Sequence, residues 1–344
     1  MTTAYLTHSR FIDHDFPQHP EHAGRIQAVW EQLGAQDLAD QLLYIEPSQA
    51  TDEQILAVHS KTHLERLTEI SHQERIVRID ADTYALPVSL EIARLAAGAV
   101  TGAVDLIAAG SADNALAIVR PPGHHATKDW QMGFCLLNNI AVAARHAQAQ
   151  HKYEKVLIID YDVHHGNGTQ DIFYADPSVM FISIHQSPLY PGSGAFNETG
   201  EGAGRGYTIN VPIPGGHGDA SYERIFADVL GPAAMKFAPD LMLISAGFDA
   251  HWVDPLASMQ LSLAGYDQLA RECLRMAEQL CGGSIVFVME GGYDLKALSH
   301  GWCNIARALL GIEALSDPYG PASNSAQRAD LYPIIEHARR IHKL

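Results

Sequence analysis

Four apolar segments of the sequence end in side chains that can carry charge or transfer a proton. These side chains are His124 and His125 after 116–119, Asp160, Asp162, His164 and Asn167 at the end of 156–160, Asp249 after 241–246, and Tyr293 after 285–290. Charged groups that leave apolar strands cost free energy unless they are paired or bind a metal. One such end would be ordinary turn chemistry, but four of them together predict a reaction site.

Asp162, His164 and Asp249 are residue types that bind metals. In an extended chain alternate side chains share a face, so Asp160, Asp162 and His164 can converge on one point, and Asp249 can join them from a neighbouring strand end. Three protein ligands that leave one position open are typical of a catalytic zinc and not of a structural one. The alternative is a turn whose Asp and His side chains bond their own backbone. The DxDxH run alone leaves both interpretations open, and the other strand ends favour the metal.

The neighbouring residues could complete a catalyst for amide hydrolysis. Two carboxylates nearly neutralise a divalent cation, so water at the ion is acidified less than at a three-histidine site, and a general base becomes useful. His124 and His125 are candidates for that base, and Asp160 and Asn167 can fix their tautomers. The Tyr293 hydroxyl could donate a hydrogen bond to an oxyanion. A tandem histidine by itself is more often an incidental loop feature, so the prediction depends on the whole set.

Apolar strands and amphipathic helices must position these side chains. The expected strands are nearly continuous apolar runs, as in a parallel sheet covered on both faces; they lie at 116–119, 156–160, 179–184, 241–246 and 285–290. Apolar residues recur at helical spacing at 26–33 and 266–280, and the second stripe places Cys273 inward as an inert thiol. Strands that alternate with helices predict an α/β fold, a single domain with a parallel β-sheet sandwiched by helices. In such folds ligands bind beyond the carboxyl ends of the strands.

Composition excludes several other classes of protein. The 344 residues include 23 Lys and Arg against 40 Asp and Glu, a net charge of −17, which argues against a nucleic-acid-binding surface. No segment approaches the roughly 20 apolar residues of a membrane span, and the first residues lack the layout of a signal peptide. The four cysteines are widely spaced without a CxxC pair, so neither a disulfide framework nor a cysteine-based zinc site is expected. We expect a soluble, cytoplasmic protein.

Five motifs, in this order, resemble the histone deacetylase family and its prokaryotic amidohydrolase relatives. They are RPPGHHA (120–126), GFCLLNN (133–139), DYDVHHGNGTQDIF (160–173), SAGFDA (245–250) and EGGYDL (290–295). The likeness runs from about Asp82 to Leu310, and the opening HP-E-x-x-x-R at 19–25 also looks similar. The resemblance implies the arginase/deacetylase fold over a single domain, 1–344, with the catalytic motifs at 82–310. The HHGNGTQ form looks like the class II branch.

The resemblance also implies roles for the strand-end residues. The implied ligands of a zinc ion, or of ferrous iron in the cell, are Asp162, His164 and Asp249. His124 would pair with Asp160 and stay charged, whereas His125 would pair with Asn167 and act as the main general base and then acid. Many relatives carry an acid in place of Asn167, and an amide raises the basicity of His125 less than a carboxylate does. Tyr293 would polarise the substrate carbonyl, and tyrosine at this position favours a competent deacetylase.

Potassium and substrate sites are further implications of the resemblance. One monovalent-cation site would use Asp160, Asp162, His164, Ser183 and Ile184, and a second would use Phe173, Asp176, Val179 and Tyr207. The implied substrate-binding residues are Asp82, Gly133, Phe134, Tyr190, Leu256, Gly291 and Gly292. Aromatic walls suit the methylene chain of an acyl-lysine, and Tyr190 departs from the phenylalanine usual in relatives.

Two positions decide what the substrate could be. Asp82 aligns with a rim aspartate that grips substrate amides, although it could equally cap the helix that follows its turn. Relatives that prefer acetylpolyamines carry an acidic residue where Leu256 stands, so leucine favours acetyl-lysine. The resemblance thus predicts a zinc-dependent amide hydrolase that removes acetyl or acyl groups from Nε-acyl-lysine of proteins or peptides, with metal-activated water, a histidine acid/base and a tyrosine oxyanion donor.

Two other functions stay open at this point. One is deacetylation of acetylpolyamines or other small amides. The other is a catalytically silent acyl-lysine reader, against which Tyr293 and the intact histidine pair weigh. The negative net charge favours lysine-rich peptides and polyamines alike. No nucleic-acid or membrane partner is expected, and the sequence does not determine the oligomeric state.

Overall fold

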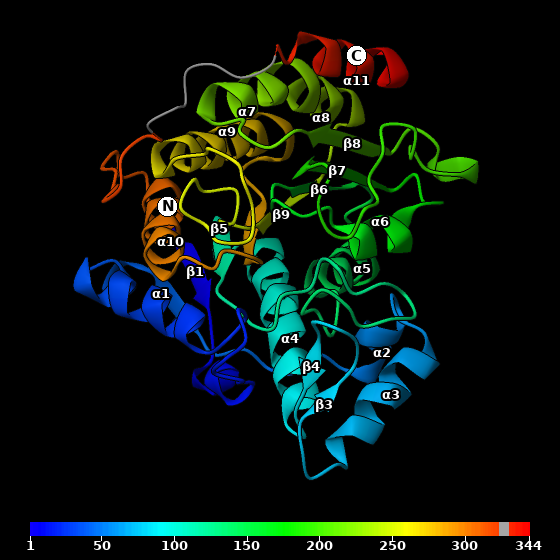
Figure 1. Cartoon of the computed structure of the whole chain (residues 1–344), viewed down its shortest axis with the longest axis vertical. Coiled ribbons are helices and arrows are strands. Elements are labelled where there is room, and N and C mark those ends of the chain that lie inside the picture. The colour runs from blue at the N-terminus through cyan, green and yellow to red at the C-terminus, as the bar shows by residue number, and fades with distance from the viewer. Residues whose placement is uncertain (323–329) are drawn as a thin grey trace.

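Eight parallel strands form the central sheet of the computed structural model, which describes residues 1–322 and 330–344. Across the sheet the order is β2-β1-β5-β10-β9-β6-β7-β8 (Figure 1). The bounds are β1 (Thr3–Leu6), β2 (Leu43–Ile45), β5 (Asn114–Ala117), β6 (Val156–Asp160), β7 (Val179–Gln186), β8 (Thr208–Ile213), β9 (Leu241–Ala246) and β10 (Ile285–Met289). A separate antiparallel pair joins β3 (Val77–Arg78) to β4 (Tyr84–Ala85).

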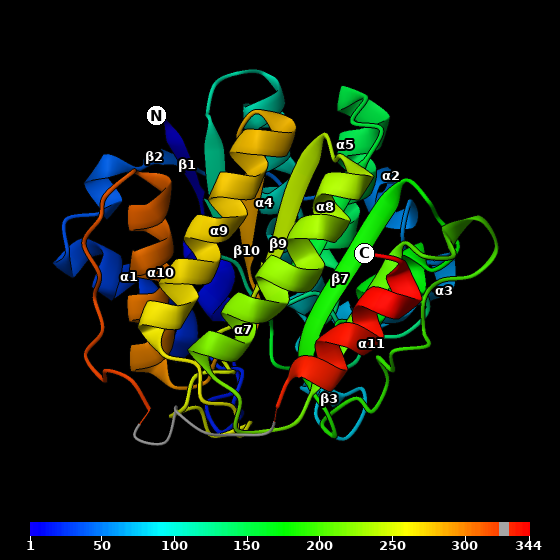
Figure 2. The ribbon, with the colours of Figure 1, turned by 90° about the horizontal axis from the view of Figure 1, so that it is seen from above.

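Helices cover both faces of the sheet, which confirms the predicted fold class. One layer contains α1 (Gly24–Ala35), α7 (Asp219–Ile225), α8 (Gly231–Phe237), α9 (Leu263–Cys281), α10 (Leu295–Leu309) and α11 (Tyr332–His342). The other contains α2 (Asp52–Leu56), α3 (Lys61–Ser71), α4 (Ser89–Ala108), α5 (Asn139–His151) and α6 (Asn167–Phe173). Figure 2 shows α7 to α11 lying in front of the strands. No helix in the described ranges is long and apolar enough to cross a bilayer.

Helix α9 shows how the sequence pattern produces a layer. The Ser262 side chain accepts a hydrogen bond from the Gly265 N–H at the start of the helix, and Gly282, with φ of 61°, ends it. The predicted apolar stripe faces the sheet, and Cys273 is fully buried within it. Burial raises the pKa of the Cys273 thiol, so this cysteine is the inert core residue that was expected.

The strand order brings the four chemically active strand ends together. β10 pairs with both β5 and β9, and β9 pairs with β6. β5 occupies Asn114–Ala117 and not 116–119 as predicted, because its ladder with β1 ends at Leu6, where β1 itself ends. The carboxyl ends of β5, β10, β9 and β6 therefore lie side by side, and their loops form one surface. This is the edge at which ligands bind in open parallel sheets.

Replacement by alanine is expected to have opposite effects on stability at two helical glycines, Gly98 in the closely packed α4 and Gly34 in α1. A Cβ atom at the buried Gly98 would lie 1.8 Å from the Ser48 carbonyl oxygen, whereas one at Gly34 in α1 would meet nothing within 4 Å. We expect Gly98→Ala to lower the free energy of unfolding by about 1–3 kcal/mol through overpacking. Gly34→Ala should raise it by about 0.4–1 kcal/mol. Urea denaturation of the two variants measures both; a Gly98→Ala protein as stable as Gly34→Ala would contradict the packing.

Candidate active site

Asp162, His164 and Asp249 meet where β6 and β9 end. The Nδ1 atom of His164 lies 3.1 Å from Asp162 Oδ1 and 3.1 Å from Asp249 Oδ2. Both carboxylates are fully buried. Backbone N–H groups hold their other oxygens, since Gly291 donates to Asp162 Oδ2 at 2.8 Å and Val163 donates to Asp249 Oδ1 at 2.9 Å. The structure therefore brings the three predicted ligands together, each with one donor atom facing a common point.

A divalent cation fits this set of donors. One ligand atom from each of the three residues lies within 4.8 Å of the other two. Burial, and then the negative charge of Asp162, raise the pKa of Asp249, which indicates a cluster with more negative charge than its histidine balances. Buried carboxylates without a counter-charge are costly. A bound cation would supply the missing charge.

The two histidines after β5 have different partners and different protonation states. The Nδ1–H of His124 donates to Asp160 Oδ2 at 3.0 Å. Burial lowers the pKa of His124, but the charges of Asp160 and Asp162 outweigh it and raise the pKa to about 10, so this ring is an imidazolium at neutral pH. His125 donates from Nδ1 to Asn167 Oδ1 at 2.7 Å. Burial, followed by the charges of His124 and His164, holds the pKa of His125 well below its ordinary value. His125 is thus neutral, and its Nε2 carries no proton.

Glu290 directly follows β10, and its carboxylate holds the backbone at the histidine pair. Its Oε2 accepts hydrogen bonds from the backbone N–H groups of Gly123 at 2.7 Å and His124 at 3.2 Å, and its Oε1 accepts one from the Ser245 hydroxyl at 3.0 Å. The side chain is fully buried, and burial raises its pKa. Glu290 was not predicted as a site residue from the sequence. The available signal was a carboxylate at the end of an apolar strand, in the EGGYDL motif.

A buried group of three charged residues holds the Tyr293 loop. Arg25 donates from Nε to the Gly292 carbonyl at 2.7 Å, and its guanidinium lies 4.9 Å from the centre of the Tyr293 ring. Glu21 accepts from Arg25 Nη1 at 3.1 Å and, with both oxygens, from Arg120 at 2.8 and 2.7 Å. All three charged side chains are fully buried. The HP-E-x-x-x-R motif contains two of them, but the sequence did not show that their partner would be the tyrosine loop.

Asp254 joins Tyr293 to the loop that follows β9. Its Oδ2 accepts a hydrogen bond from the Tyr293 N–H at 2.7 Å, and its Oδ1 accepts one from the Leu256 N–H at 3.0 Å. Burial, and then the charge of Asp249, raise the pKa of Asp254 to about 7. Asp254 was not predicted as a site residue from the sequence.

A narrow cavity of about 210 Å³ leads to these groups. It is lined by Asp82, His125, Gly133, Phe134, His164, Leu189, Tyr190, Leu256 and Tyr293. The Phe134 ring stands nearly perpendicular to the Tyr293 ring at 5.8 Å, and the Tyr190 ring is perpendicular to His125 at 5.1 Å. A Cβ at Gly133, where φ is 55°, would lie 2.3 Å from the His125 ring, so only glycine fits there. Among the described lining residues, Leu189 was not predicted from the sequence.

Of the remaining residues predicted to bind substrate, one lines the cavity and two do not. Asp82 lines the cavity and does not cap the helix after its turn, because α4 begins at Ser89 without a side-chain cap. Gly291 and Gly292 are not among the described residues that line the cavity. Gly291 instead lies against the two candidate carboxylate ligands, where a Cβ would approach Asp249 Oδ2 to 2.2 Å and Asp162 Oδ2 to 2.5 Å. The absence of a side chain at Gly291 makes room for these carboxylates, and its role toward substrate stays a prediction.

The residues of the two predicted potassium sites lie in or next to α6, β6, β7 and β8. Asp160 lies opposite Ser183 in the sheet, close to Asp162, His164 and Ile184. In the second cluster, the carbonyl oxygens of Phe173 and Tyr207 already accept backbone hydrogen bonds, from Asp176 and Phe181 respectively. The Asp176 carboxylate is paired with Arg145. Potassium at either cluster stays a prediction.

Comparisons with known proteins place the chain among deacetylases. The profile of a family described as "Histone deacetylase domain" matches residues 19–309, so the match includes the HP-E-x-x-x-R segment. Histone deacetylase 14, chloroplastic, of Arabidopsis thaliana is 39% identical and aligns with 98% of this chain and 84% of its own length. A probable deacetylase of Archaeoglobus fulgidus is 36% identical, covering 99% and 98%. The crystal structure of the HDA15 HD domain superposes with a TM-score of 0.89 at 37% identity, covering 99% of this chain and 94% of that one.

Proposed function

The chain belongs to the histone deacetylase family, and from this premise we propose that it is a zinc-dependent deacylase of Nε-acetyl-lysine in peptides or proteins. The observation that carries the proposal is the narrow cavity. It has aromatic walls, and His125, His164 and Tyr293 lie together among its lining residues. An extended acyl-lysine side chain fits between such walls, since methylene groups pack well against aromatic faces.

Asp162, His164 and Asp249 would hold the zinc, or ferrous iron in the cell. When bound, the ion would act as a Lewis acid toward the amide carbonyl and would acidify a water molecule. The other residues of the site would position and move protons around that chemistry. Potassium at the two predicted clusters and a cytoplasmic location are further parts of the proposal.

His125 is the general base and then the general acid. Its Nδ1 is committed to Asn167 and its Nε2 is unprotonated, so Nε2 can take a proton from the attacking water and return it to the departing lysine amine. His124 stays charged beside Asp160 and stabilises negative charge that develops near it. Tyr293 donates a hydrogen bond to the carbonyl oxygen as it becomes an oxyanion. Burial raises the pKa of the Tyr293 hydroxyl well above its ordinary value, which keeps it protonated.

The substrate class rests on the residues nearer the mouth. Phe134 and Tyr190 form walls for the methylene chain, and Asp82 would accept hydrogen bonds from substrate backbone amides. Leu256 borders the same cavity and offers no attraction for a distal ammonium. These features support acetyl-lysine over acetylpolyamines, which remain the second candidate.

Replacing Leu256 by glutamate should shift the enzyme toward polyamines. The new carboxylate at the cavity mouth would attract the free ammonium of acetylspermidine, so we expect the ratio of kcat/KM for acetylspermidine to kcat/KM for an acetyl-lysine peptide to rise roughly tenfold, or about 1.4 kcal/mol. Leu256→Gln is the control, because it has nearly the same size without the charge. Equal ratios in the two variants would show that Leu256 does not determine the substrate class.

A substrate panel with metal-loaded enzyme tests the function itself. The proposal predicts turnover of a fluorogenic acetyl-lysine peptide with a higher kcat/KM than acetylspermidine. Hydrolysis of acetylspermidine with no turnover of the peptide would establish the second candidate. Binding of the peptide without turnover of any substrate would make the chain an acyl-lysine reader.

A further inference from the structure

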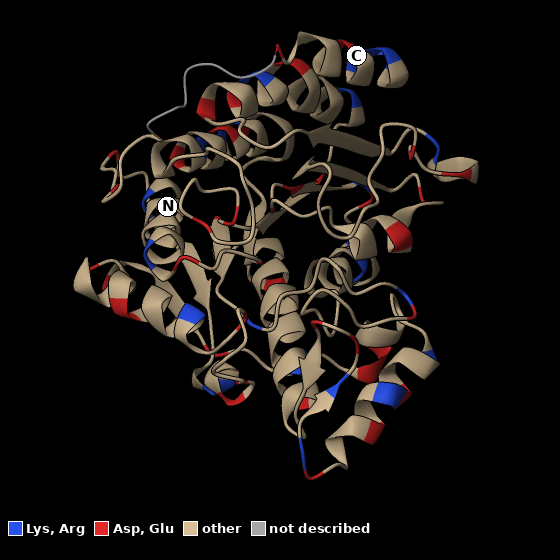
Figure 3. Cartoon of the chain, viewed as in Figure 1, with Lys and Arg blue, Asp and Glu red and all other residues tan. Residues whose placement is uncertain are grey.

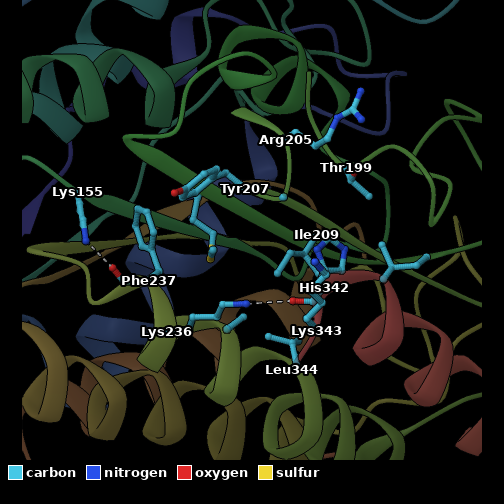
Figure 4. A pocket seen from close by; sticks show the side chains of 14 residues that line it. Lys155, Thr199, Arg205, Tyr207, Ile209, Lys236, Phe237, His342, Lys343 and Leu344 are labelled. Carbon is cyan, nitrogen blue, oxygen red and sulfur yellow. Dashed lines mark hydrogen bonds between the residues drawn. The ribbon is translucent and has the colours of Figure 1, made fainter. Parts of the chain in front are cut away.

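A second and larger cavity lies at the opposite edge of the sheet from the candidate active site. It has a volume of about 540 Å³ and is bordered by the residues just before β6 and β8 and by helices α8 and α11. Figure 4 shows its lining side chains, with Lys155 and Phe237 on one side and Arg205 on the other. The catalytic strand ends lie at the carboxyl edge of the sheet, whereas this cavity opens near the amino ends of β6 and β8. The proposed deacylase mechanism does not use it.

The cavity is positively charged although the chain as a whole carries a net charge of −17. The described residues that line it include the cations Lys155, Arg205, Lys236 and Lys343 and no Asp or Glu side chain. In the part of the chain that the structure describes, none of these cations forms an ion pair. Lys155 and Lys236 donate only to backbone carbonyls, those of Phe237 at 3.1 Å and His342 at 3.2 Å. Figure 3 shows further Lys and Arg positions, coloured blue, along α11.

Apolar side chains form the floor of the cavity, beneath the exposed cations. Met180, Ile209 and Phe237 are 5%, 1% and 3% exposed. His342 is 8% exposed and borders the same space. Burial, and then the charge of Lys236, lower the pKa of His342 to about 4, so this ring is neutral at neutral pH. Among the residues that the structure describes, none makes a hydrogen bond to its Nδ1 atom.

We propose that this cavity binds a small organic anion with an apolar body. The apolar end would pack on Ile209 and Phe237, and a carboxylate or phosphate head group would lie among the cations at the mouth. The volume is in the range of small-molecule sites, which combine apolar walls with a few polar anchors. Unpaired cations around a low-dielectric floor attract anions against the overall charge of the protein.

Calorimetric titration of the metal-loaded enzyme tests the proposal, with hexanoate, hexyl phosphate, hexylamine and inorganic phosphate as probes. We expect saturable binding of at least one of the two hexyl anions, weaker binding of inorganic phosphate and none of hexylamine. The double variant Arg205→Met/Lys236→Met should weaken hexyl-anion binding at least tenfold. The control, Lys61→Met/Arg75→Met on the far side of the molecule, removes the same charge and should bind like the unaltered protein. All variants keep the catalytic residues, so their deacetylase activity reports correct folding.

Three results would overturn the proposal. The first is that neither hexyl anion binds, and the second is that the double variant and the control bind the anions equally. The third is that inorganic phosphate binds as tightly as hexyl phosphate. The last result would show that the apolar side chains of the floor do not contribute to binding. A carboxylate bound at the catalytic centre cannot imitate the expected result, because both double variants leave that centre unchanged.

Discussion

Replacing Tyr293 by phenylalanine is expected to lower kcat for an acetyl-lysine peptide by about 100- to 1,000-fold, or ~2.7–4 kcal/mol of transition-state stabilisation. The variant removes one hydroxyl donor at the point where negative charge develops on the carbonyl oxygen. The ring should keep its place, because Arg25 packs over it and Asp254 accepts the hydrogen bond of its backbone N–H. The loss would therefore report the hydroxyl alone.

Tyr190→Phe is the matched control for this prediction. Tyr190 lines the same cavity and also loses one phenolic hydroxyl, but it has no place in the oxyanion chemistry, so its kcat should stay within a few-fold of the unaltered enzyme. Steady-state kinetics of both variants decide the matter. Unchanged turnover in Tyr293→Phe would show that the tyrosine hydroxyl takes no part in catalysis.

Replacing Glu21 by glutamine is expected to lower the free energy of unfolding by about 3–5 kcal/mol. Its carboxylate is the buried counter-charge for both Arg25 and Arg120, and removing one partner leaves uncompensated buried charge. Because Arg25 also holds the Gly292 carbonyl, activity should fall as well. Urea denaturation measures the loss of stability.

A double variant tests whether the loss of stability comes from uncompensated buried charge. Glu21→Gln/Arg120→Met removes one cation together with the anion, so it should be less unstable than the sum of the two single losses. Additive losses, or a Glu21→Gln protein of normal stability, would show that the cluster does not stabilise the fold.

The same cluster predicts the direction of acid sensitivity. Burial raises the pKa of Glu21, but the charge and hydrogen bonds of Arg120 more than reverse this and hold the pKa well below its ordinary value of 4.5. The folded state thus binds fewer protons than the unfolded state in acid, so the stability from Glu21 is present above pH 4.5 and is lost as the pH falls further. The Glu21→Gln protein should lose less stability over that interval.

The elements that position the site were largely predictable from sequence, because buried parallel strands are continuous apolar runs. Five of the eight strands of the sheet were expected, and β6, β7, β9 and β10 began where predicted. The three that were missed, β1, β2 and β8, have weaker patterns: β8 contains Pro212, and β2 has only three residues.

The candidate site was predictable where its residues follow strand ends and unpredictable where distant segments meet. Asp162 and His164 are two residues apart, so local geometry suggests a common target. Glu290 contacts Gly123 and His124 from a strand far along the chain, and Arg25 reaches the Tyr293 loop across most of the sequence. Such contacts follow from the strand order β5-β10-β9-β6, which no local pattern contains.

Turnover of a fluorogenic acetyl-lysine peptide by the chelator-stripped chain, before and after zinc is added back, tests the central claim most directly. Removal of the metal is expected to abolish hydrolysis, and about one zinc per chain is expected to restore it, whereas Asp249→Asn protein should regain little activity under the same conditions. Full hydrolysis of the peptide by metal-free protein would contradict the assignment of Asp162, His164 and Asp249 as the catalytic metal site.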